Sequence, residues 1–407
     1  MTRDNDAISP WDDDTIIALR QINDLRQQLK QRFVDRDTAI DVLTLAVVAQ
    51  EHVLLVGEPG TAKSQIITSF ARLIEARRFE YLLTRFTEPS ELFGPLDLAR
   101  FREGGYHIQT SGMLPEADIV FLDEVFEGSS AILNTLLKVA NERIFNNGPE
   151  IQRVRVLTLV GATNSLPEDD ALRAFSDRFM LRVKINRVRS EDMTRLLKVG
   201  MDFDEEQVSA AIGDPEADSG ELIEIEALRR LHGQLNQVRI DGELLHVYRR
   251  IVDHLRSDNI EISDRRFVRG VRLIKAAALL RGSPTCESQD LWPLRHMWSR
   301  VGEDDQIARV LRESFPELEI PEELNLPPER EVVFELLRRI GSGIRAAGPG
   351  SGVPGNYANV LRLLEELGAL RRVQRRYFPS DADLQDKIAA EIRMALDCLA
   401  ATEVDHV

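Results

Sequence analysis

Hydrophobic positions follow two patterns along the chain, one before residue 190 and one after it. Short, continuous apolar runs bounded by turn residues predict strands that are buried on both faces of a parallel sheet. Five predicted strands precede residue 190, at residues 53–56, 79–83, 119–124, 156–164 and 179–183. Beyond residue 190, apolar residues recur only at helical spacing. The pattern therefore predicts an α/β fold with a five-stranded parallel sheet, followed by all-helical segments.

The same patterns, together with proline punctuation, divide the chain into five parts. In chain order these are a polar tail with one helix (1–34), the α/β core (35–188), a helical domain (189–315), a proline-rich linker (316–328) and a small C-terminal helical module (329–407). The last helix of the helical domain is expected at residues 288–301. The last helix of the C-terminal module is expected to be capped by Ser380.

Two segments interrupt the core with patterns of paired short strands. The first has strand-like pieces at Leu96–Phe101 and Tyr106–Thr110, on either side of Gly104-Gly105. The second turns at Asn147-Gly148, a dipeptide that favours tight hairpin turns. We therefore expect two hairpins inserted into the core.

A glycine-bearing loop lies between the first apolar run and a helical pattern. In this context a loop binds phosphate through its backbone N–H groups and the positive end of the helix. Lys63 is expected to reach the β- and γ-phosphates of a nucleotide, and Ser64 to place its hydroxyl on Mg²⁺. Ala62 replaces the second glycine of the pattern; because it lies at the helix start, we expect a negative φ that tolerates its methyl group. The predicted nucleotide-binding residues are Gly57, Glu58, Pro59, Gly60, Thr61, Ala62, Lys63, Ser64 and Gln65.

Polar residues end the third and fourth apolar runs. Asp123 and Glu124 follow Ile119–Leu122 directly, at the strand end where open α/β sheets bind their ligands. We expect Asp123 to bind in the Mg²⁺ shell and Glu124 to orient or deprotonate the attacking water. Asn164 ends the next run, where it would hydrogen-bond the γ-phosphate or that water; a turn-forming asparagine is the alternative.

Two arginines complete the candidate catalytic set. Arg178 lies just ahead of the fifth apolar run, where it is either a solvated loop charge or an arginine supplied to the nucleotide of a neighbouring subunit. Arg265 is expected in the first turn of a helix, where a cation opposes the helix dipole. That placement suggests contact with an anion such as a phosphate, and a solvent-facing arginine is the alternative. Arg266, its neighbour, is the other candidate for this role.

Composition limits the partners and the compartment. A net charge of −16 and 6% aromatic residues disfavour nucleic acid or an anionic membrane as the main partner. The two cysteines, Cys286 and Cys398, are far apart without metal-ligand spacing, which fits a reducing compartment. The first residues lack the pattern of a signal peptide, and no apolar run approaches the ~20 residues of a membrane span. We therefore expect a cytoplasmic protein.

With these motifs in order, residues from about 35 to 315 resemble a MoxR-family AAA+ ATPase, closest to the RavA branch. The motifs that carry the resemblance are GEPGTAKS (57–64), FEYLLTRFTEPSELFGPL (79–96), TSGMLPEADIVFLDEVF (110–126), AILNTLLKVANER (131–143), GATNSLPEDD (161–170), SDRFMLRV (176–183) and SDRRF (263–267). Members of the family also have alanine before the P-loop lysine.

The resemblance implies a role for each candidate residue. Lys63 and Ser64 correspond to Walker A, and Asp123 with Glu124 to Walker B. Asn164 corresponds to sensor 1, Arg178 to the arginine finger and Arg265 to sensor 2. It further implies ATP and Mg²⁺ as ligands, a hexameric ring, a helical lid domain after the core, and a partner with a von Willebrand factor A (vWA) domain. Residues 329–407 lie outside the resemblance.

The resulting hypothesis is an ATPase that remodels or chaperones a partner protein. A nucleotide-gated scaffold, in which ATP binding alone assembles the ring, is the alternative. A DNA motor is disfavoured by the net charge and the few aromatic residues.

Overall fold

The structure is a computed structural model that describes residues 11–167, 169–201, 223–318, 320, 330–346, 356–377 and 381–404. The chain divides into two compact units, Met1–Asn325 and Leu326–Val407. The start of the predicted tail, most of the predicted linker and Ser380 lie outside the described residues.

The first unit is built on the predicted five-stranded parallel sheet, which the structure confirms. Its strands are β1 (Val53–Val56), β2 (Arg78–Leu82), β3 (Ile119–Asp123), β6 (Thr158–Thr163) and β7 (Leu181–Lys184). They are ordered β2-β3-β6-β1-β7, and every neighbouring pair is parallel. All carboxyl ends therefore meet at one edge of the sheet and all amino ends at the other.

Residues 79–83 were predicted to form a buried strand. The strand is present, but the prediction that it is buried is wrong. β2 lies at the edge of the sheet, and none of its residues is buried. Its alternation of polar and apolar residues, Arg-Phe-Glu-Tyr-Leu, is typical of a half-exposed strand. By contrast, every residue of β1 and β6 is buried, which continuous apolar runs predict.

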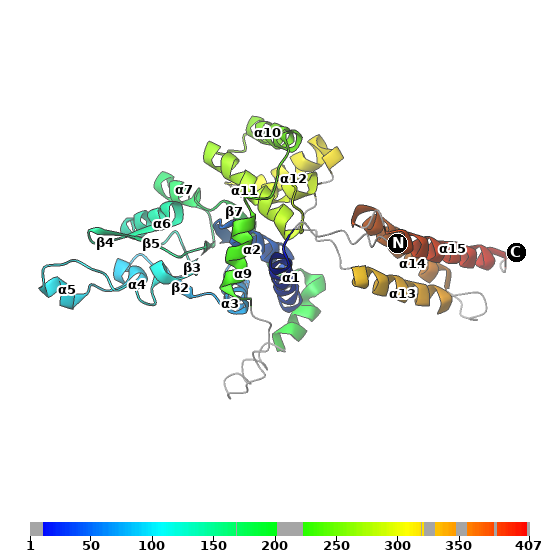
Figure 1. Ribbon diagram of the computed structural model, residues 1–407, viewed down its shortest axis with the longest axis horizontal. Coiled ribbons are helices and arrows are strands. Elements are labelled where there is room, and N and C mark those ends of the chain that lie inside the picture. The colour runs from blue at the N-terminus through cyan, green and yellow to red at the C-terminus, as the bar shows by residue number, and fades with distance from the viewer. Residues whose placement is uncertain are drawn as a thin grey trace, which may run out of the picture. The chain divides into compact units, whose positions relative to one another are not determined.

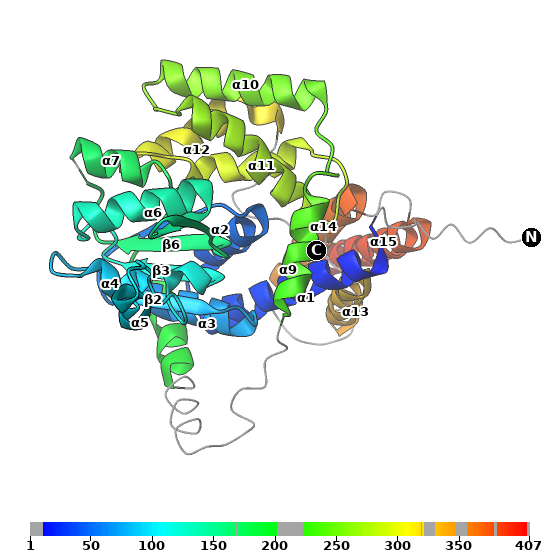
Figure 2. The same ribbon diagram turned by 60° about the vertical axis from the view of Figure 1, so that its left-hand side comes forward.

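Helices cover both faces of the sheet. In Figure 2, α6 (Ser130–Glu142) is drawn above β6 and α3 (Lys63–Leu73) below β2, and α2 (Asp37–Ala49) packs against β1 and β7. α1 (Asp13–Arg32) packs against α2 and α3, and α7 (Asp170–Ser176) precedes β7. From Ala39 to Ala49 every residue of α2 is buried, because the helix is enclosed by the sheet, α1 and the helical domain.

The first insert differs from the predicted hairpin. It contains α4 (Pro89–Phe93), α5 (Leu98–Arg102) and η1 (Leu114–Glu116), and only Leu96 and Ile108 pair in antiparallel fashion. The helix forms because Asp97 caps it, accepting hydrogen bonds from the backbone N–H groups of Ala99 and Arg100. In the second insert, β4 (Ile144–Asn147) and β5 (Glu150–Arg153) pair antiparallel around Gly148-Pro149.

The helical domain follows β7. Its elements are η2 (Ser190–Asp192), a helix at 193–201, α9 (Ile225–Gln234), α10 (Gly242–Ser257), α11 (Asp264–Leu280), η4 (Ser288–His296), α12 (Glu303–Ser314) and η5 (Pro316–Leu318). The expected helix at 288–301 is instead a 3₁₀ segment that contains Pro293, which has no backbone N–H group to donate. α12 was not predicted; it begins after Gly302, whose φ is +93°.

The second unit is a bundle of three helices, α13 (Arg330–Ala346), α14 (Asn356–Tyr377) and α15 (Ala382–Val404), with a core of its own (Figure 1). Asp381 accepts a hydrogen bond from the backbone N–H group of Leu384 at 3.0 Å and so caps α15. Within the described ranges, no helix has the length and apolar character that a membrane span requires.

Candidate active site

Three candidate segments meet at the carboxyl edge of the sheet. Gly57 follows β1, Glu124 follows β3 and Asn164 follows β6, and these three strands are neighbours in the order β3-β6-β1. The loop at 57–62 leads into α3, whose first two residues are Lys63 and Ser64. The topology thus gathers the predicted phosphate loop and the acidic pair at one edge.

The phosphate loop turns through two left-handed residues. Gly60 has φ +77° and Ala62 has φ +66°, so the expectation of a negative φ at Ala62 is wrong. Ala62 precedes α3 as its N-cap, and this turn directs the chain into the helix at the cost of some backbone strain. A Cβ atom on Gly57 would lie 2.2 Å from the carbonyl oxygen of Ile185, so only glycine allows this close approach to the chain after β7.

Lys63 is folded back onto its own loop. Its Nζ donates to the carbonyl oxygens of Gly57 at 2.7 Å and Glu58 at 2.9 Å. Burial lowers the pKa of Lys63, and the carboxylates of Asp123 and Glu124 oppose that shift. The ammonium is thus held by two neutral carbonyl groups of the phosphate loop, and its charge suits an anionic ligand.

Ser64 and Asp123 offer the oxygen ligands that Mg²⁺ prefers. Ser64 lies in the first turn of α3 and Asp123 is the last residue of β3, and both side chains are half-buried. A hydroxyl, a carboxylate and a lysine next to a helix N-terminus together fit a nucleotide phosphate with its magnesium ion.

Glu124 and Asn164 contact each other directly. The amide Nδ2 of Asn164 donates to Oε1 of Glu124 at 2.5 Å, and the backbone N–H of Glu124 donates to Oδ1 of Asp123 at 3.0 Å. Glu124 has φ +47°, which is a strained value for a residue with a side chain. Burial, followed by the charge of Asp123, raises the pKa of Glu124. The carboxylate is therefore oriented by an amide and more basic than an ordinary glutamate.

Arg178 and Arg265 are not brought to this edge within one chain. Arg178 precedes β7 and so lies by the amino edge. The guanidinium of Arg265 donates from Nη2 to Oδ1 of Asn141, near the end of α6, at 2.5 Å. Two residues later, Arg143 donates to the carbonyl oxygens of Gln50 and Leu157, which precede β1 and β6. This end of α6, and Arg265 with it, therefore also lies by the amino edge.

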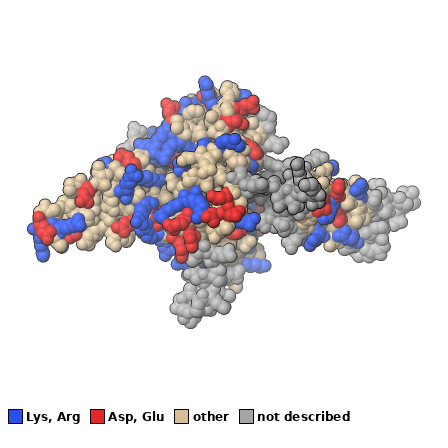
Figure 3. Space-filling view, in the orientation of Figure 1, with Lys and Arg blue, Asp and Glu red and all other residues tan. Residues whose placement is uncertain are grey.

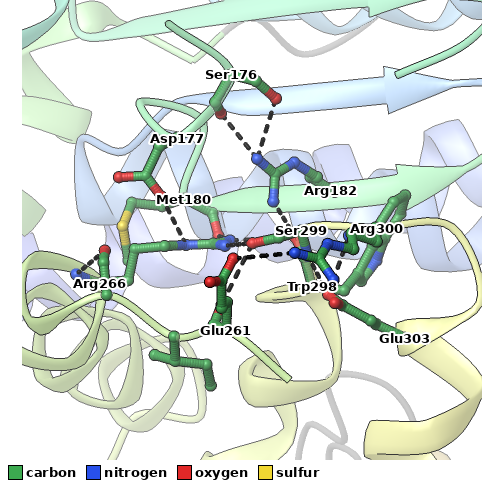
Figure 4. Close-up of polar contacts among 12 residues, drawn as sticks. Ser176, Asp177, Met180, Arg182, Glu261, Arg266, Trp298, Ser299, Arg300 and Glu303 are labelled. Carbon is green, nitrogen blue, oxygen red and sulfur yellow. Dashed lines mark hydrogen bonds and ion pairs between the residues drawn. The ribbon is translucent and has the colours of Figure 1, made fainter. Parts of the chain in front are cut away.

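The structure distinguishes Arg265 from Arg266. Arg266 is fully buried, and it donates to the carbonyl oxygen of Met180 at 3.0 Å and to Oγ of Ser299 at 2.6 Å (Figure 4). Its guanidinium is thus engaged within the chain. Arg265 is only half-buried, so Arg265 rather than Arg266 stays the candidate that can reach a phosphate.

Two arginines near these segments were not singled out from the sequence. Arg36, which precedes α2, donates from Nε to the carbonyl oxygen of Thr61 at 3.2 Å and supports the phosphate loop. Arg182 is fully buried in β7. A cation inside the apolar run Phe179–Val183 is a signal that could have identified Arg182, whereas Arg36 has no comparable local signal.

Comparison with known proteins gives two family matches. The profile of the family described as "MoxR domain in the MoxR-vWA-beta-propeller ternary systems" matches residues 20–225, and that of an AAA lid domain matches residues 242–311. An uncharacterised protein of Methanocaldococcus jannaschii is 38% identical over 299 residues, which cover 72% of this chain and 74% of that protein.

Two further relatives are more distant. The chaperone MoxR1 of Mycobacterium tuberculosis is 23% identical over 174 residues, 42% of this chain and 45% of that protein. The crystal structure of a candidate ATPase from Cytophaga hutchinsonii shares the fold, with a TM-score of 0.60 at 16% identity, and covers 74% of this chain and 96% of that one. The RavA branch stays a prediction. The extent of the family match and the similarity to the Methanocaldococcus protein show that this chain belongs to the MoxR family of AAA+ ATPases.

Proposed function

We propose that this chain hydrolyses ATP with Mg²⁺ at the subunit interfaces of a homohexameric ring. The observation that carries the proposal is the separation of the required groups within one chain. Lys63, Asp123 and Glu124 lie at the carboxyl edge of the sheet, whereas Arg178 and Arg265 lie by the amino edge. A complete site needs both sets around one triphosphate, and a second copy of the chain supplies the missing set when opposite edges of neighbours meet.

Each residue then has a defined task. The backbone N–H groups of the loop and Lys63 bind the phosphates, and Ser64 with Asp123 holds Mg²⁺, which neutralises phosphate charge when bound. Glu124 accepts the proton of the attacking water, and Asn164 holds that carboxylate in place. Arg178 of the neighbouring subunit stabilises the charge that develops on the γ-phosphate, and Arg265 adds a second cation.

We further propose that the energy is used on a protein partner with a vWA domain, in the cytoplasm. The matching family is described by systems that combine MoxR, vWA and beta-propeller components, which supports such a partner. On the face in Figure 3, acidic and basic side chains are interspersed over the described residues, and the net charge is −16. Both features favour a protein over nucleic acid as the partner, because nucleic-acid binding gathers basic side chains into a field.

The test mixes two inactive variants. Arg178→Ala should lower ATP turnover by ~10³–10⁵-fold and Glu124→Gln by ~10²–10⁴-fold. Mixed in equal amounts, they should restore activity, because some interfaces then combine an intact Glu124 with an intact Arg178 from the neighbour.

Light scattering with and without Mg²⁺-ATP should show about six subunits in the active sample. A mixture that stays inactive while the ring forms would contradict a site shared between subunits. A chain that stays monomeric with nucleotide would contradict the ring.

A further inference from the structure

The segment Ser176–Met180, which carries Arg178, is held at both ends by buried guanidinium groups. Arg182 donates from Nη2 to the carbonyl oxygen of Ser176 at 2.9 Å and to its Oγ at 3.1 Å. Arg266 donates from Nη2 to the carbonyl oxygen of Met180 at 3.0 Å. Arg182 belongs to β7 and Arg266 to α11, so both the core and the helical domain hydrogen-bond to the segment (Figure 4).

Both guanidinium groups also converge on one turn of the helical domain. The carbonyl oxygen of Trp298 accepts hydrogen bonds from Nη1 of Arg182 and from Nη2 of Arg266. This turn is tied to the start of α12, because Oε2 of Glu303 accepts from the backbone N–H groups of Ser299 at 2.7 Å and Arg300 at 2.9 Å. A shift of the turn relative to the sheet would therefore be transmitted to both ends of the Arg178 segment.

Two buried cations at this place are costly for the fold. Arg182 and Arg266 are each at most 2% exposed. Asp177, whose Oδ1 lies 3.9 Å from Nε of Arg266, and the buried carboxylate of Glu303 compensate the charge. Apolar side chains would fill the same space without desolvating two charges. The arrangement therefore indicates a demand for fixed geometry rather than for stability.

Arg178 itself contrasts with the two residues that surround it. Among the described residues, its buried Nε has no hydrogen-bond partner. The side chain is half-buried, and the buried Nε belongs to the guanidinium itself. The backbone of Arg178 is thus fixed, while its guanidinium has no partner among the described residues.

We propose that Arg182 and Arg266 form a clamp that positions Arg178 for the nucleotide of the neighbouring subunit and couples that position to the helical domain. The inference rests on the proposed function, since it needs Arg178 to act between subunits. The clamp residues act through the segment 176–180, whose Ser176 and Met180 carbonyl groups they bind. The clamp explains why Arg266 is buried while its neighbour Arg265 is not.

The main test is the variant Arg266→Met, which keeps the length of the side chain and removes its donors. We expect kcat for ATP to fall by ~10²-fold, as for a catalytic group displaced by about 1 Å, with KM nearly unchanged because the variant keeps its own phosphate loop. Mixed 1:1 with Glu124→Gln, it should recover to about a quarter of wild-type activity, because half of the subunits keep an intact site and half of their neighbours supply a well-placed Arg178. A variant that was merely unstable would gain nothing from the mixture.

The matched control is Arg300→Met. Arg300 lies in the same turn, but its side chain is exposed and forms an ion pair with Glu261 at 3.3 Å. We expect its activity to equal that of the wild type, and a loss as large as that of Arg266→Met would overturn the clamp.

The mixture of Arg178→Ala with Glu124→Gln separates the possible failures. If that mixture recovers and the Arg266→Met mixture does not, the clamp is wrong while the shared site stands. If neither recovers, the proposed function itself fails.

Should Arg266→Met not fold, the variant Arg266→Lys provides the test, because lysine keeps the charge but cannot reach Met180, Trp298 and Ser299 together. Full activity in Arg266→Lys would overturn the proposal, and a low kcat that recovers in the mixture would support it.

Discussion

The carboxyl and amino edges of the sheet both collect charged side chains, but they hold them in opposite ways. At the carboxyl edge, Asp123 and Glu124 are half-buried and Asn164 is exposed. At the amino edge, Arg182 and Arg266 are fully buried and donate to carbonyl groups within the chain. One edge is left open to a ligand, whereas the other is closed around its own backbone.

Backbone strain occurs at both edges and does not separate them. Ala62 and Glu124 at the carboxyl edge have positive φ values without being glycine, and so do Gln50 and Arg143 at the amino edge. The comparison therefore teaches that the edges differ in how their charged side chains are held. One edge leaves its polar side chains open to a ligand, while the other builds a support from which Arg178 can project.

The largest expected effect is at the carboxyl edge. Glu124→Gln should lower ATP turnover by ~10²–10⁴-fold and leave nucleotide binding intact, because the amide fills the same space but cannot accept a proton. Phosphate release and binding of a fluorescent ATP analogue measure the two quantities. Near-normal turnover would contradict the role of Glu124. Equal release of the partner protein by the variant and the wild type would favour the scaffold hypothesis.

A smaller effect is expected for Asn164→Ala, with a roughly tenfold lower rate at neutral pH. Its hydrogen bond lowers the pKa of Glu124, which burial and Asp123 raise, so removing the amide should raise that pKa further. Glu124 is active as the carboxylate, and the acid limb of the pH–rate profile should therefore move to higher pH. The exposed Asn146→Ala on β4 is the control and should leave the limb unchanged. A limb that stays in place in Asn164→Ala would disprove the assignment.

At the amino edge, pH should change stability rather than rate. His52 precedes β1; its Nδ1 accepts from the N–H of Leu159 at 3.1 Å and its Nε2 donates to the carbonyl oxygen of Ala140 at 2.9 Å. Burial lowers the pKa of His52 from 6.5 to about 3. Between these values the unfolded chain binds a proton at His52 that the folded chain does not, so the stability that His52 contributes falls as pH drops below 6.5.

The expected contribution of His52 is about 2 kcal/mol between pH 6.5 and pH 5. Urea unfolding at both pH values measures the change in the free energy of unfolding. On acidification from pH 6.5 to pH 5, this free energy should fall by about 2 kcal/mol less in His52→Gln than in the wild type. His246→Gln, at an exposed histidine of α10, should keep the full wild-type loss. If acidification lowered the free energy of unfolding equally in His52→Gln and the wild type, the assigned role of His52 at the amino edge would be wrong.

Local patterns predicted which residues gather at the carboxyl edge, but not the positive φ of Ala62 there. The phosphate loop and the pair Asp123-Glu124 follow directly from runs of adjacent residues. The exposure of β2 depends on its position at the sheet edge, and the helix Leu98–Arg102 depends on a cap at Asp97 that competed with a hairpin pattern. The alternation of polar and apolar residues in β2 is compatible with a half-exposed strand, whereas the spacing of apolar residues does not contain the helix Leu98–Arg102.

The sequence by itself determined the five-stranded parallel sheet, the helical domain after it, and which residues form the candidate phosphate site. It could do so because period, apolar runs and strand–loop–helix order are properties of neighbouring residues. Only the tertiary structure decided at which edge of the sheet Arg178 and Arg265 lie. It also decided that Arg266, and not Arg265, is buried. The physical reason is that these outcomes depend on contacts between distant segments, such as the hydrogen bond from Arg266 to Met180, and folding alone brings those segments together.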